Sequence, residues 1–487
     1  MPVKFGTDGW RAVIGEEFTF ANLRQVAKAI ADYVAETRRD SKARRQALPG
    51  QAPLVVGFDT RFLSDRYAME ASRILAEEGL PVCLSRSDCP SPALAYAIRH
   101  LDAAGGIMIT ASHNPPRYNG IKFKGHHGGP ALSHETRRIE EILGQNLSSG
   151  WTPSASDWAF SDSGSEYPGI ERFDPMPAYL AHLRTLVDFD VIRGSGLHVA
   201  VDAMYGAGRG YTAAFLRQAG CEVTELHGEM NPGFAGIHPE PIERNLGDLM
   251  ATMCSGDFDI GLATDGDADR IGAVDANGAF VDPHRIFSLI LRHLVDERQG
   301  RGAVVKTVST TQLLNRLAQH YRLPLYETPV GFNHICALML EKDVLMGGEE
   351  SGGITIKSHV PDGDGILMGL LLIELLAYRN RPLHEIITEL MQQFGEFHYG
   401  RDDVHVPAFD KSELTQRLTQ EAPEIILQKR VLQVNNSDGV KYLLDDDSWL
   451  LIRPSGTEPV LRIYAEARNR YEVPGLLQAG ASLAHVQ

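Results

Sequence analysis

Short apolar runs alternate with helix-like stretches over most of the chain. One stretch with helical spacing, residues 67–79, ends at a glycine, and a second runs to residue 321. The apolar runs that read as strands are residues 53–58, 105–110, 197–202, 259–263 and 303–308. Strands that alternate with helices imply crossover connections, so the pattern predicts α/β units with mostly parallel sheets.

Two segments depart from this pattern. Residues 148–169 are rich in Ser, Gly and Pro and carry no apolar period, which is typical of a loop or linker. Beyond about residue 395 the composition changes to charged helices and a strand pair near residues 448–453 and 460–465. The change favours a smaller C-terminal α+β domain.

Size and charge narrow the class of protein. The chain has 487 residues, and a single hydrophobic core stops growing near about 250–300 residues, so we expect several domains. Apolar residues make up 43% and charged residues 23%, the balance of an ordinary globular protein. The formal charge of −16 disfavours binding of nucleic acid or of an anionic membrane. A small anionic substrate would need local clusters of Arg and Lys.

No segment has the pattern of a signal peptide or a membrane span. The longest apolar run, residues 366–377, is interrupted by Glu374 and predicts a buried helix. The five cysteines are scattered and odd in number, which argues against a disulfide framework. We therefore expect a cytoplasmic, soluble protein.

The first candidate motif is Thr-Ala-Ser-His-Asn-Pro at residues 110–115, directly after an apolar run. A serine at the end of a strand, followed by prolines, lies on a constrained loop where its hydroxyl can face a site. A hydroxyl is a poor nucleophile unless it is activated or already phosphorylated. Ser112 is therefore a candidate carrier of a transferred group; alternatively, Ser112 and His113 only shape a turn.

The second motif is Asp-Gly-Asp-Ala-Asp-Arg at residues 265–270. The alternate carboxylates of Asp265, Asp267 and Asp269 can converge on one hard cation, and a few carboxylates completed by phosphate or water suit Mg²⁺. A calcium-binding EF-hand loop is excluded because Arg270 stands where that loop needs glycine. The alternative is three solvated acids on an open turn.

The third motif is Gly-Gly-Glu-Glu-Ser-Gly-Gly at residues 347–353. It lacks the lysine and the spacing of a nucleotide-binding P-loop. Glu349 and Glu350 beside the hydroxyl of Ser351 suit hydrogen bonds from sugar hydroxyls better than phosphate binding. A tight turn with solvated acids explains the segment equally well.

The fourth motif is Arg-Pro-Ser-Gly-Thr-Glu-Pro at residues 453–459. An arginine fork, two hydroxyls and the backbone N–H groups of a glycine turn form a cradle for a phosphate dianion. A hairpin turn bounded by prolines is the alternative. Lys122 and Arg11 add positive charge to the same picture, although each alone is more often a surface residue.

Taken together and in this order, the four motifs resemble those of the α-D-phosphohexomutase superfamily, which includes phosphoglucomutases, phosphomannomutases and phosphoglucosamine mutases. The resemblance extends from Phe-Gly-Thr-Asp-Gly-Trp-Arg at residue 5 to residue 459. It implies three related α/β domains with mixed, mostly parallel sheets and a smaller α+β domain around a central cleft. We expect these domains at residues 1–165, 166–280, 281–395 and 396–487.

The resemblance also implies a role for each motif. Ser112 would carry the phosphoryl group and, with the three aspartates, would bind one Mg²⁺. Lys122 would act as acid or base, helped by Arg11 and His113, and Arg270 would neutralise charge on the transferring group together with Mg²⁺. The residues implied in sugar and phosphate binding are Glu349, Ser351, Arg453, Ser455, Gly456 and Thr457. Asn333 occupies the position of an active-site lysine in some relatives, with His334 next to it, so the role of this pair stays open.

The implied reaction interconverts hexose 1- and 6-phosphates through a 1,6-bisphosphate, which also serves as activator. The double acid of residues 349–350 favours glucose phosphates; mannose or glucosamine phosphates are the alternatives. A glucose 1,6-bisphosphate synthase and a non-catalytic sugar-phosphate-binding protein are further alternatives. The expected partners are small sugar phosphates, with no nucleic acid or membrane, and we expect a monomer or weak dimer.

Overall fold

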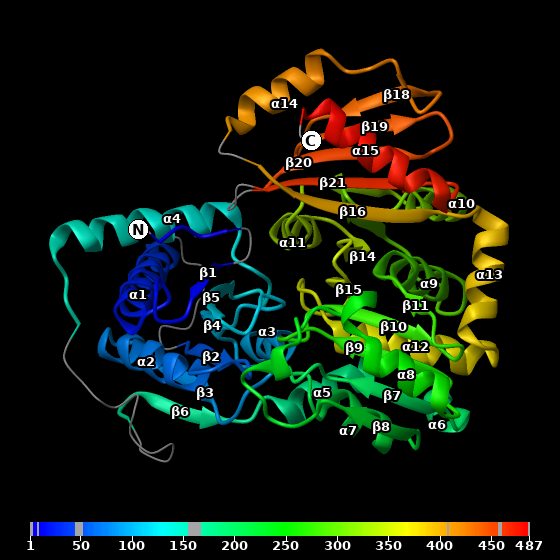
Figure 1. Ribbon diagram of the computed structural model, residues 1–487. Helices are drawn as coiled ribbons and strands as arrows, with labels where there is room; N and C mark the ends of the chain where they lie inside the picture. Colours follow the sequence, from blue (N-terminus) through cyan, green and yellow to red (C-terminus); the bar gives the residue numbers. More distant parts are fainter. Residues whose placement is uncertain are drawn as a thin grey trace.

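The computed structural model describes residues 3–6, 9–43, 52–153, 167–406, 409–455 and 460–485. Its strands form four sheets. In Figure 1 the sheets and their helices form four units that follow one another along the chain, from blue and cyan through green and yellow to orange and red. The predicted fold class, three α/β domains and a smaller C-terminal domain, is confirmed.

The first unit has a six-stranded sheet in the order β1-β5-β4-β2-β3-β6. The inner strands β2 and β4 are parallel and buried along their whole length, which explains why they read as continuous apolar runs. Strands β1 and β5 run antiparallel to their neighbours. The elements are β1 (Trp10–Val13), α1 (Phe20–Ala43), β2 (Leu54–Phe58), α2 (Ser64–Glu77), β3 (Val82–Ser85), α3 (Ser91–His100), β4 (Gly105–Ile109), β5 (Tyr118–Gly125), α4 (Ser133–Ser149) and β6 (Ile170–Phe173).

The predicted linker at residues 148–169 lies between α4 and β6. Helix α4 continues to Ser149, two residues into the predicted linker, and β6 begins at Ile170. Residues 154–166 lie outside the described part of the chain.

The second unit has a five-stranded mixed sheet in the order β11-β10-β9-β7-β8. The predicted strands at 197–202 and 259–263 are β7 and β9, which pair in parallel at its centre. The elements are α5 (Met176–Leu186), α6 (Phe189–Ser195), β7 (His198–Asp202), α7 (Tyr211–Gln218), β8 (Glu222–Leu226), η2 (Phe234–Gly236), η3 (Glu243–Asn245), α8 (Gly247–Ser255), β9 (Ile260–Thr264), β10 (Ile271–Asp275) and β11 (Phe280–Val281).

The third unit has a four-stranded sheet in the order β13-β12-β14-β15, in which only the β14-β15 pair is antiparallel. The predicted strand at 303–308 is β12, and the helix-like stretch to residue 321 contains α10. The elements are α9 (Pro283–Asp296), β12 (Ala303–Thr307), α10 (Leu313–Tyr321), β13 (Leu325–Thr328), α11 (Phe332–Glu341), β14 (Val344–Gly348), β15 (Ile354–Ile356), α12 (Gly365–Arg379) and α13 (Leu383–Phe394).

Helix α12 joins the second and third units into one apolar core. It contacts α6, α7, β9 and β10 of the second unit as well as α9 and β15 of the third, and Figure 1 places its label beside β10. Many buried apolar side chains of both units form one continuous cluster. The sequence predicted this buried helix, but its position between two sheets was not predicted.

The acid inside α12 is fully paired. Glu374 is completely buried, and its Oε1 lies 2.7 Å from His293 Nε2 and 3.0 Å from Arg298 Nε. Its Oε2 accepts a hydrogen bond of 2.6 Å from the backbone N–H of Asp188. Each carboxylate oxygen therefore has a partner, which is how a charge is tolerated in an apolar core.

The fourth unit is a six-stranded antiparallel sheet in the order β16-β21-β20-β19-β18-β17, with α15 against it. The predicted strand pair is β20 and β21. Strands β16 and β18 were not predicted because both are largely exposed and neither contains a continuous apolar run. The elements are β16 (His398–His405), α14 (Lys411–Gln420), β17 (Ile425–Ile426), β18 (Lys429–Asn435), β19 (Val440–Leu444), β20 (Trp449–Pro454), β21 (Val460–Ala467), η4 (Arg470–Glu472) and α15 (Val473–Leu483).

Among the described residues, no helix combines the length and the apolar character that crossing a membrane would require.

Candidate active site

The loop after β4 presents a buried serine to the second unit. Ser112 has a φ of 50°, a left-handed conformation that is uncommon for residues other than glycine, and it is 1% exposed. Its Oγ donates a hydrogen bond of 2.7 Å to Asp265 Oδ2, although the two residues are 153 positions apart in the chain. His113 Nδ1 lies 3.5 Å from the same Oγ. The fold thus joins the first and second predicted motifs.

A buried arginine, which the sequence analysis missed, holds this loop in shape. Arg61 Nε donates to Asp59 Oδ2 at 3.1 Å, and Asp59 Oδ2 also accepts from Thr110 Oγ1 at 2.7 Å. The guanidinium also donates to backbone carbonyls of Ser112, Asn114, Pro115 and Tyr118. The only sequence signal was an acid at the end of β2 with an arginine two residues later.

The three predicted metal ligands converge in the loop between β9 and β10. One carboxylate oxygen from each of Asp265, Asp267 and Asp269 lies within 4.8 Å of the others. Asp267 Oδ2 accepts from Ser91 Oγ at 2.6 Å and from Lys122 Nζ at 3.0 Å. Asp267 Oδ1 is buried and has no hydrogen-bond partner among the described residues. An unpartnered carboxylate oxygen within a cluster of oxygens suits a hard cation such as Mg²⁺.

Ser91, at the N-terminus of α3, is a second residue that the sequence analysis missed. Its backbone N–H donates to the carbonyl of Asp267 at 2.8 Å, in addition to the bond from its hydroxyl. The acid loop of the second unit is therefore docked on a helix of the first.

The acids do not share one electrostatic environment. Burial, followed by repulsion from Asp269 and Asp267, raises the pKa of Asp265 well above its ordinary value. Burial also opposes the charged form of Asp267, but Lys122 and the Ser91 hydroxyl outweigh it and hold its pKa below the ordinary value. A bound cation would favour the charged form of all three carboxyls.

Two of the predicted basic residues lie at the acid cluster. Lys122, on β5 and 1% exposed, has its Nζ 3.0 Å from an oxygen of both Asp267 and Asp269. Arg270 donates its backbone N–H to Asp265 Oδ1 at 3.2 Å, and its Nε lies 3.9 Å from Asp269 Oδ1. Burial opposes the charge on Arg270, but the surrounding acids outweigh it and raise its pKa.

The other two predicted basic groups lie beside the serine. Arg11 Nη1 donates to Asn114 Oδ1 at 2.8 Å, so β1 contacts the same loop. Burial, and then the positive charges of Arg270 and Arg11, hold the pKa of His113 well below its ordinary value. The imidazole of His113 is therefore neutral at neutral pH.

The loop after β14 gives its two glutamates different surroundings. Glu349 Oε1 accepts from the backbone N–H of Gly331 at 2.8 Å. Glu350 Oε2 accepts from Ser309 Oγ at 2.6 Å and from Thr307 Oγ1 at 3.2 Å, which ties it to the third sheet. Ser351 Oγ is buried without a partner among the described residues, as expected of a hydroxyl that meets a ligand.

This loop also meets the second unit directly. The backbones of Arg270 and Gly353 form an isolated β-bridge. Asn333 Nδ2 donates to Ser133 Oγ of the first unit at 2.9 Å, and no hydrogen bond among the described residues joins His334 to the acid cluster. Asn333 therefore connects two units, and a role for His334 remains a prediction.

The fourth motif lies at the turn between β20 and β21. Arg453 Nε donates to Asp438 Oδ2 at 2.7 Å, and the buried Ser455 accepts at its carbonyl from Lys411 Nζ. Gly456 and Thr457 lie outside the described residues, so their roles stay predictions.

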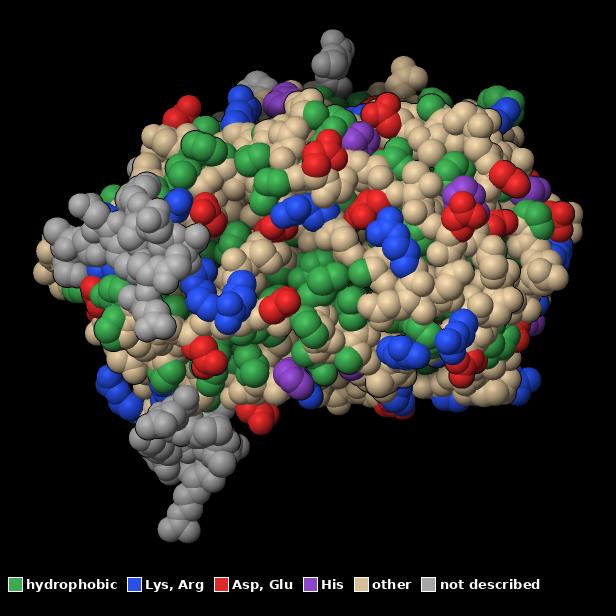
Figure 2. All heavy atoms as spheres, turned by 90° about the horizontal axis from the view of Figure 1, so that it is seen from below, with side chains coloured by type: hydrophobic (Ala, Val, Ile, Leu, Met, Phe, Trp, Pro, Cys, Tyr) green, Lys and Arg blue, Asp and Glu red, His purple; other side chains and the backbone are tan. Residues whose placement is uncertain are grey.

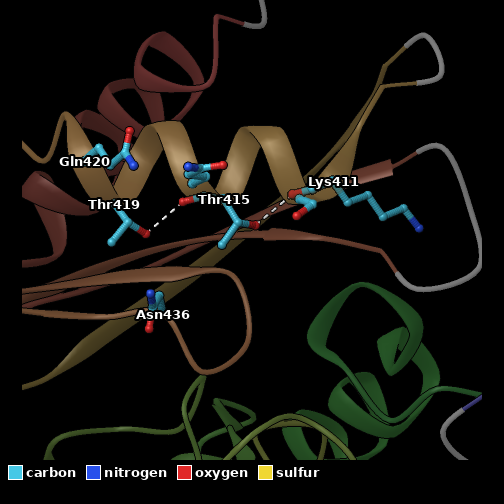
Figure 3. Close-up of a pocket in the computed structure, with 7 residues that line it drawn as sticks. Lys411, Thr415, Thr419, Gln420 and Asn436 are labelled. Atoms are coloured by element: carbon cyan, nitrogen blue, oxygen red, sulfur yellow. Dashed lines mark hydrogen bonds between the residues drawn. The ribbon is translucent and has the colours of Figure 1, made fainter.

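A groove of about 600 Å³ on the fourth unit is separate from the acid cluster. Figure 3 shows it beside α14, with Thr415, Thr419 and Gln420 along the helix and Asn436 opposite. Thr415 and Thr419 donate their hydroxyls to backbone carbonyls of the same helix. The hydroxyls of both threonines are thus already used by the helix itself.

Charge on the outer surface is mixed. On the face seen in Figure 2, Lys and Arg side chains alternate with Asp and Glu, and neither sign forms a continuous patch. Three basic side chains, Arg11, Arg61 and Lys122, lie at the Ser112 loop, where Arg61 and Lys122 are paired with aspartates.

The chain matches the four domains of one enzyme family in order. It matches the alpha/beta/alpha domains I, II and III of phosphoglucomutase/phosphomannomutase over residues 2–149, 177–278 and 282–394, and the C-terminal domain over residues 413–479.

Relatives with these domains match along their whole length. The "phosphoglucomutase/phosphomannomutase" of Thermococcus kodakarensis is 30% identical over 480 residues, which cover 98% of both chains. A "probable phosphoglucosamine mutase" of Methanopyrus kandleri is 31% identical over 96% of this chain and 94% of its own.

A crystal structure shares the same arrangement. It is that of a "putative phosphomannomutase" from Thermus thermophilus, with 35% identity and a TM-score of 0.83, covering 100% of this chain and 99% of its own. Since fold, motifs and relatives agree over the whole length, the chain belongs to the phosphoglucomutase/phosphomannomutase family and is an intramolecular phosphotransferase of the phosphohexomutase type.

Proposed function

We propose that the enzyme interconverts glucose 1-phosphate and glucose 6-phosphate through a phosphoryl group carried on Ser112. The observation that supports this most strongly is the 2.7 Å hydrogen bond from Ser112 Oγ to Asp265, which puts a hydroxyl of one domain on the acid cluster of another. A phosphoryl group on that oxygen would lie beside the three aspartates and Lys122.

The aspartates and the phosphate on Ser112 would hold one Mg²⁺. When bound, the ion would offset negative charge on the phosphoryl group during transfer. The unpartnered Asp267 Oδ1 supports this assignment. Arg11, which donates to Asn114 of the Ser112 loop, and Arg270, at the end of the acid loop, would offset further negative charge on the phosphoryl group.

In the first half-reaction the bond between Ser112 Oγ and phosphorus breaks, and a bond forms from phosphorus to the free hydroxyl of the sugar monophosphate. Ser112 Oγ gains a proton and the sugar hydroxyl loses one, so no net proton is released. Lys122, ion-paired with Asp267 and Asp269, would act as the acid or base, and His113, whose Nδ1 lies 3.5 Å from Ser112 Oγ, would assist beside the same oxygen. The remaining work is positioning and electrostatics.

The second half-reaction reverses the first from the other end of the sugar. The 1,6-bisphosphate turns over in the site and returns a phosphoryl group to Ser112. During both steps Arg453 and Ser455, with Gly456 and Thr457, would hold the phosphate that is not transferred. Glu349 and Ser351 would bind sugar hydroxyls, because one is an acceptor and the other is an unpartnered buried hydroxyl.

The choice of glucose rests on the pair Glu349 and Glu350. The relatives carry names for glucose, mannose and glucosamine phosphates. A coupled assay with these phosphates, with and without added glucose 1,6-bisphosphate, tests the proposal. A preference for mannose or glucosamine phosphate of about tenfold or more in kcat/KM, or roughly 1.4 kcal/mol, would overturn the assignment of glucose phosphates as the substrates. Accumulation of free glucose 1,6-bisphosphate would indicate a synthase instead.

A further inference from the structure

One carboxylate connects the third and fourth domains directly beside the arginine of the fourth motif. Asp438 lies in the turn between β18 and β19. Its Oδ2 accepts a hydrogen bond of 2.7 Å from Arg453 Nε and a second, of 2.9 Å, from the backbone N–H of Val330 in the third domain. A single oxygen thus joins a side chain of one domain to the backbone of another.

The turn that carries Asp438 is held against the strand of Arg453. Gly439 has a φ of 79°, and a Cβ built on it would lie 2.5 Å from the carbonyl oxygen of Ile452 and 2.8 Å from the Cα of Arg453. Only glycine permits this approach. The backbone that carries Asp438 is therefore held close to Arg453, with the carboxylate at the Nε edge of the guanidinium.

The other partner of Asp438 belongs to the loop between β13 and α11. The N–H groups of two consecutive residues point to two acids: Val330 N–H to Asp438, and Gly331 N–H to Glu349 Oε1 at 2.8 Å. The side chain of Val330 packs against a small apolar cluster that includes Trp449 and Tyr464 of the fourth domain. The loop is therefore anchored on both sides.

We propose that Asp438 is a positioning residue that aligns Arg453 with Glu349 through residues 330 and 331. It would thereby set the spacing between the group that holds the non-transferred phosphate and the group that holds a sugar hydroxyl. The inference rests on the proposed function, because it takes Arg453 and Glu349 as substrate ligands.

The direction in which phosphate binding changes after loss of Asp438 distinguishes a positioning role from a purely electrostatic one. Removing an anion beside Arg453 would, by Coulomb attraction alone, tighten binding of a phosphate. A guanidinium held by its Nε edge keeps its plane fixed and directs its terminal N–H groups. Weaker binding after loss of Asp438 would therefore report lost orientation.

The experiment compares Asp438→Ala with a matched control in steady-state kinetics with glucose 1-phosphate. We expect KM to rise about tenfold to hundredfold, with kcat changed by less than about threefold, because the lost bonds involve charged groups. Asp438→Asn, which keeps an acceptor oxygen, should recover most of the loss. The control is Asp447→Ala, which removes another contact between these domains, from Arg316 Nε at 2.9 Å, but does not touch Arg453. The control should keep the parent KM.

A double variant makes the test specific to the pair. In an Arg453→Ala background, Asp438→Ala should add no further rise in KM, because the group it positions is gone. An unchanged or lower KM in Asp438→Ala, an equal rise in the control, or full additivity would overturn the inference. Titration calorimetry with glucose 6-phosphate on the same variants measures binding without turnover. If the parent enzyme showed no turnover, only the proposed function would be refuted. The Kd values for glucose 6-phosphate, compared among the parent and the variants, would still decide the role of Asp438.

Discussion

The surroundings of helix α12 and the acid loop at residues 265–270 both bury carboxylates, but they treat them differently. In α12 both oxygens of Glu374 have partners, from a histidine, an arginine and a backbone N–H. In the acid loop three carboxylates crowd together, and one oxygen of Asp267 has no partner among the described residues. Complete pairing is what we expect of a buried acid that serves only the fold, and an oxygen without a partner is what we expect of one that binds a ligand.

The largest expected effect comes from removing one hydroxyl from each region. Ser112→Ala should lower kcat by at least about a thousandfold, because the oxygen that carries the phosphoryl group is lost. Tyr179→Phe removes the hydroxyl that donates to Asp364, the N-cap of α12, at 2.7 Å. It should cost about 1 kcal/mol of stability and leave kcat unchanged. Steady-state kinetics measure kcat, and urea unfolding measures the stability of the two variants. A fully active Ser112→Ala enzyme would refute the proposal that Ser112 carries the phosphoryl group.

Neutralising one acid in each region should separate activity from stability. Asp267→Asn should lower kcat by roughly a hundredfold or more with little change in KM, because the metal favours the transition state over the bound substrate. Glu374→Gln should keep kcat but lose about 3 kcal/mol of unfolding free energy, because Arg298 and His293 lose a buried charge partner. An unchanged kcat in Asp267→Asn would remove the metal from that loop.

Added Mg²⁺ should stabilise the folded protein only by binding to the acid loop. Millimolar Mg²⁺ should raise the Tm of the parent by about 3 °C, because it binds the native carboxylate cluster and not the unfolded chain. The rise should persist in Glu374→Gln and shrink in Asp267→Asn. Differential scanning calorimetry with Mg²⁺ and with a chelator provides the measurement. Equal rises in both variants would show that the ion binds elsewhere.

The smallest effect concerns pH and the start of α12. His182 Nε2 lies 3.0 Å from His359 Nδ1, His359 Nε2 lies 2.8 Å from Asp364, and Tyr96 stacks on His182. Burial, and then His359, lower the pKa of His182 to about 4. Because the unfolded chain takes up this proton near pH 6.5 and the native chain does not, stability should fall as the pH drops from about 6.5 to 4.

His182→Gln removes this titrating group and should flatten the loss in that interval. Unfolding free energies measured across the range, for parent and variant, provide the comparison. The titrations of the acid loop are common to both proteins and cancel in the difference. Parallel curves would show that His182 does not carry the effect.

The sequence predicted those parts of the fold that have a local signal. Strands β2, β4, β9 and β12 are buried throughout, and β7 is buried after its first residue, so they appear as continuous apolar runs. Strands β16 and β18 are largely exposed and contain no continuous apolar run, so the sequence did not predict them.

In the candidate site, too, the sequence predicted only what has a local signal in the chain. The serine and aspartate motifs are recognisable in the chain, but their contact across 153 positions appears only in the fold. Arg61, Ser91 and Asp438 belong to no motif, so only their hydrogen bonds reveal their roles. The resemblance to known mutases, rather than periodicity, is what brought the four motifs together.

The start of helix α12 also lies against the end of the acid loop. A Cβ on Gly365 would lie 2.1 Å from the carbonyl oxygen of Arg270, and one on Gly363 would lie 2.7 Å from that of Asp269. Backbone therefore touches backbone where the second and third domains meet. In a chimaera whose third domain comes from a relative, the backbone that packs against the acid loop would also come from the relative. Such a chimaera should therefore take both its substrate preference and its cation affinity from the donor of the third domain.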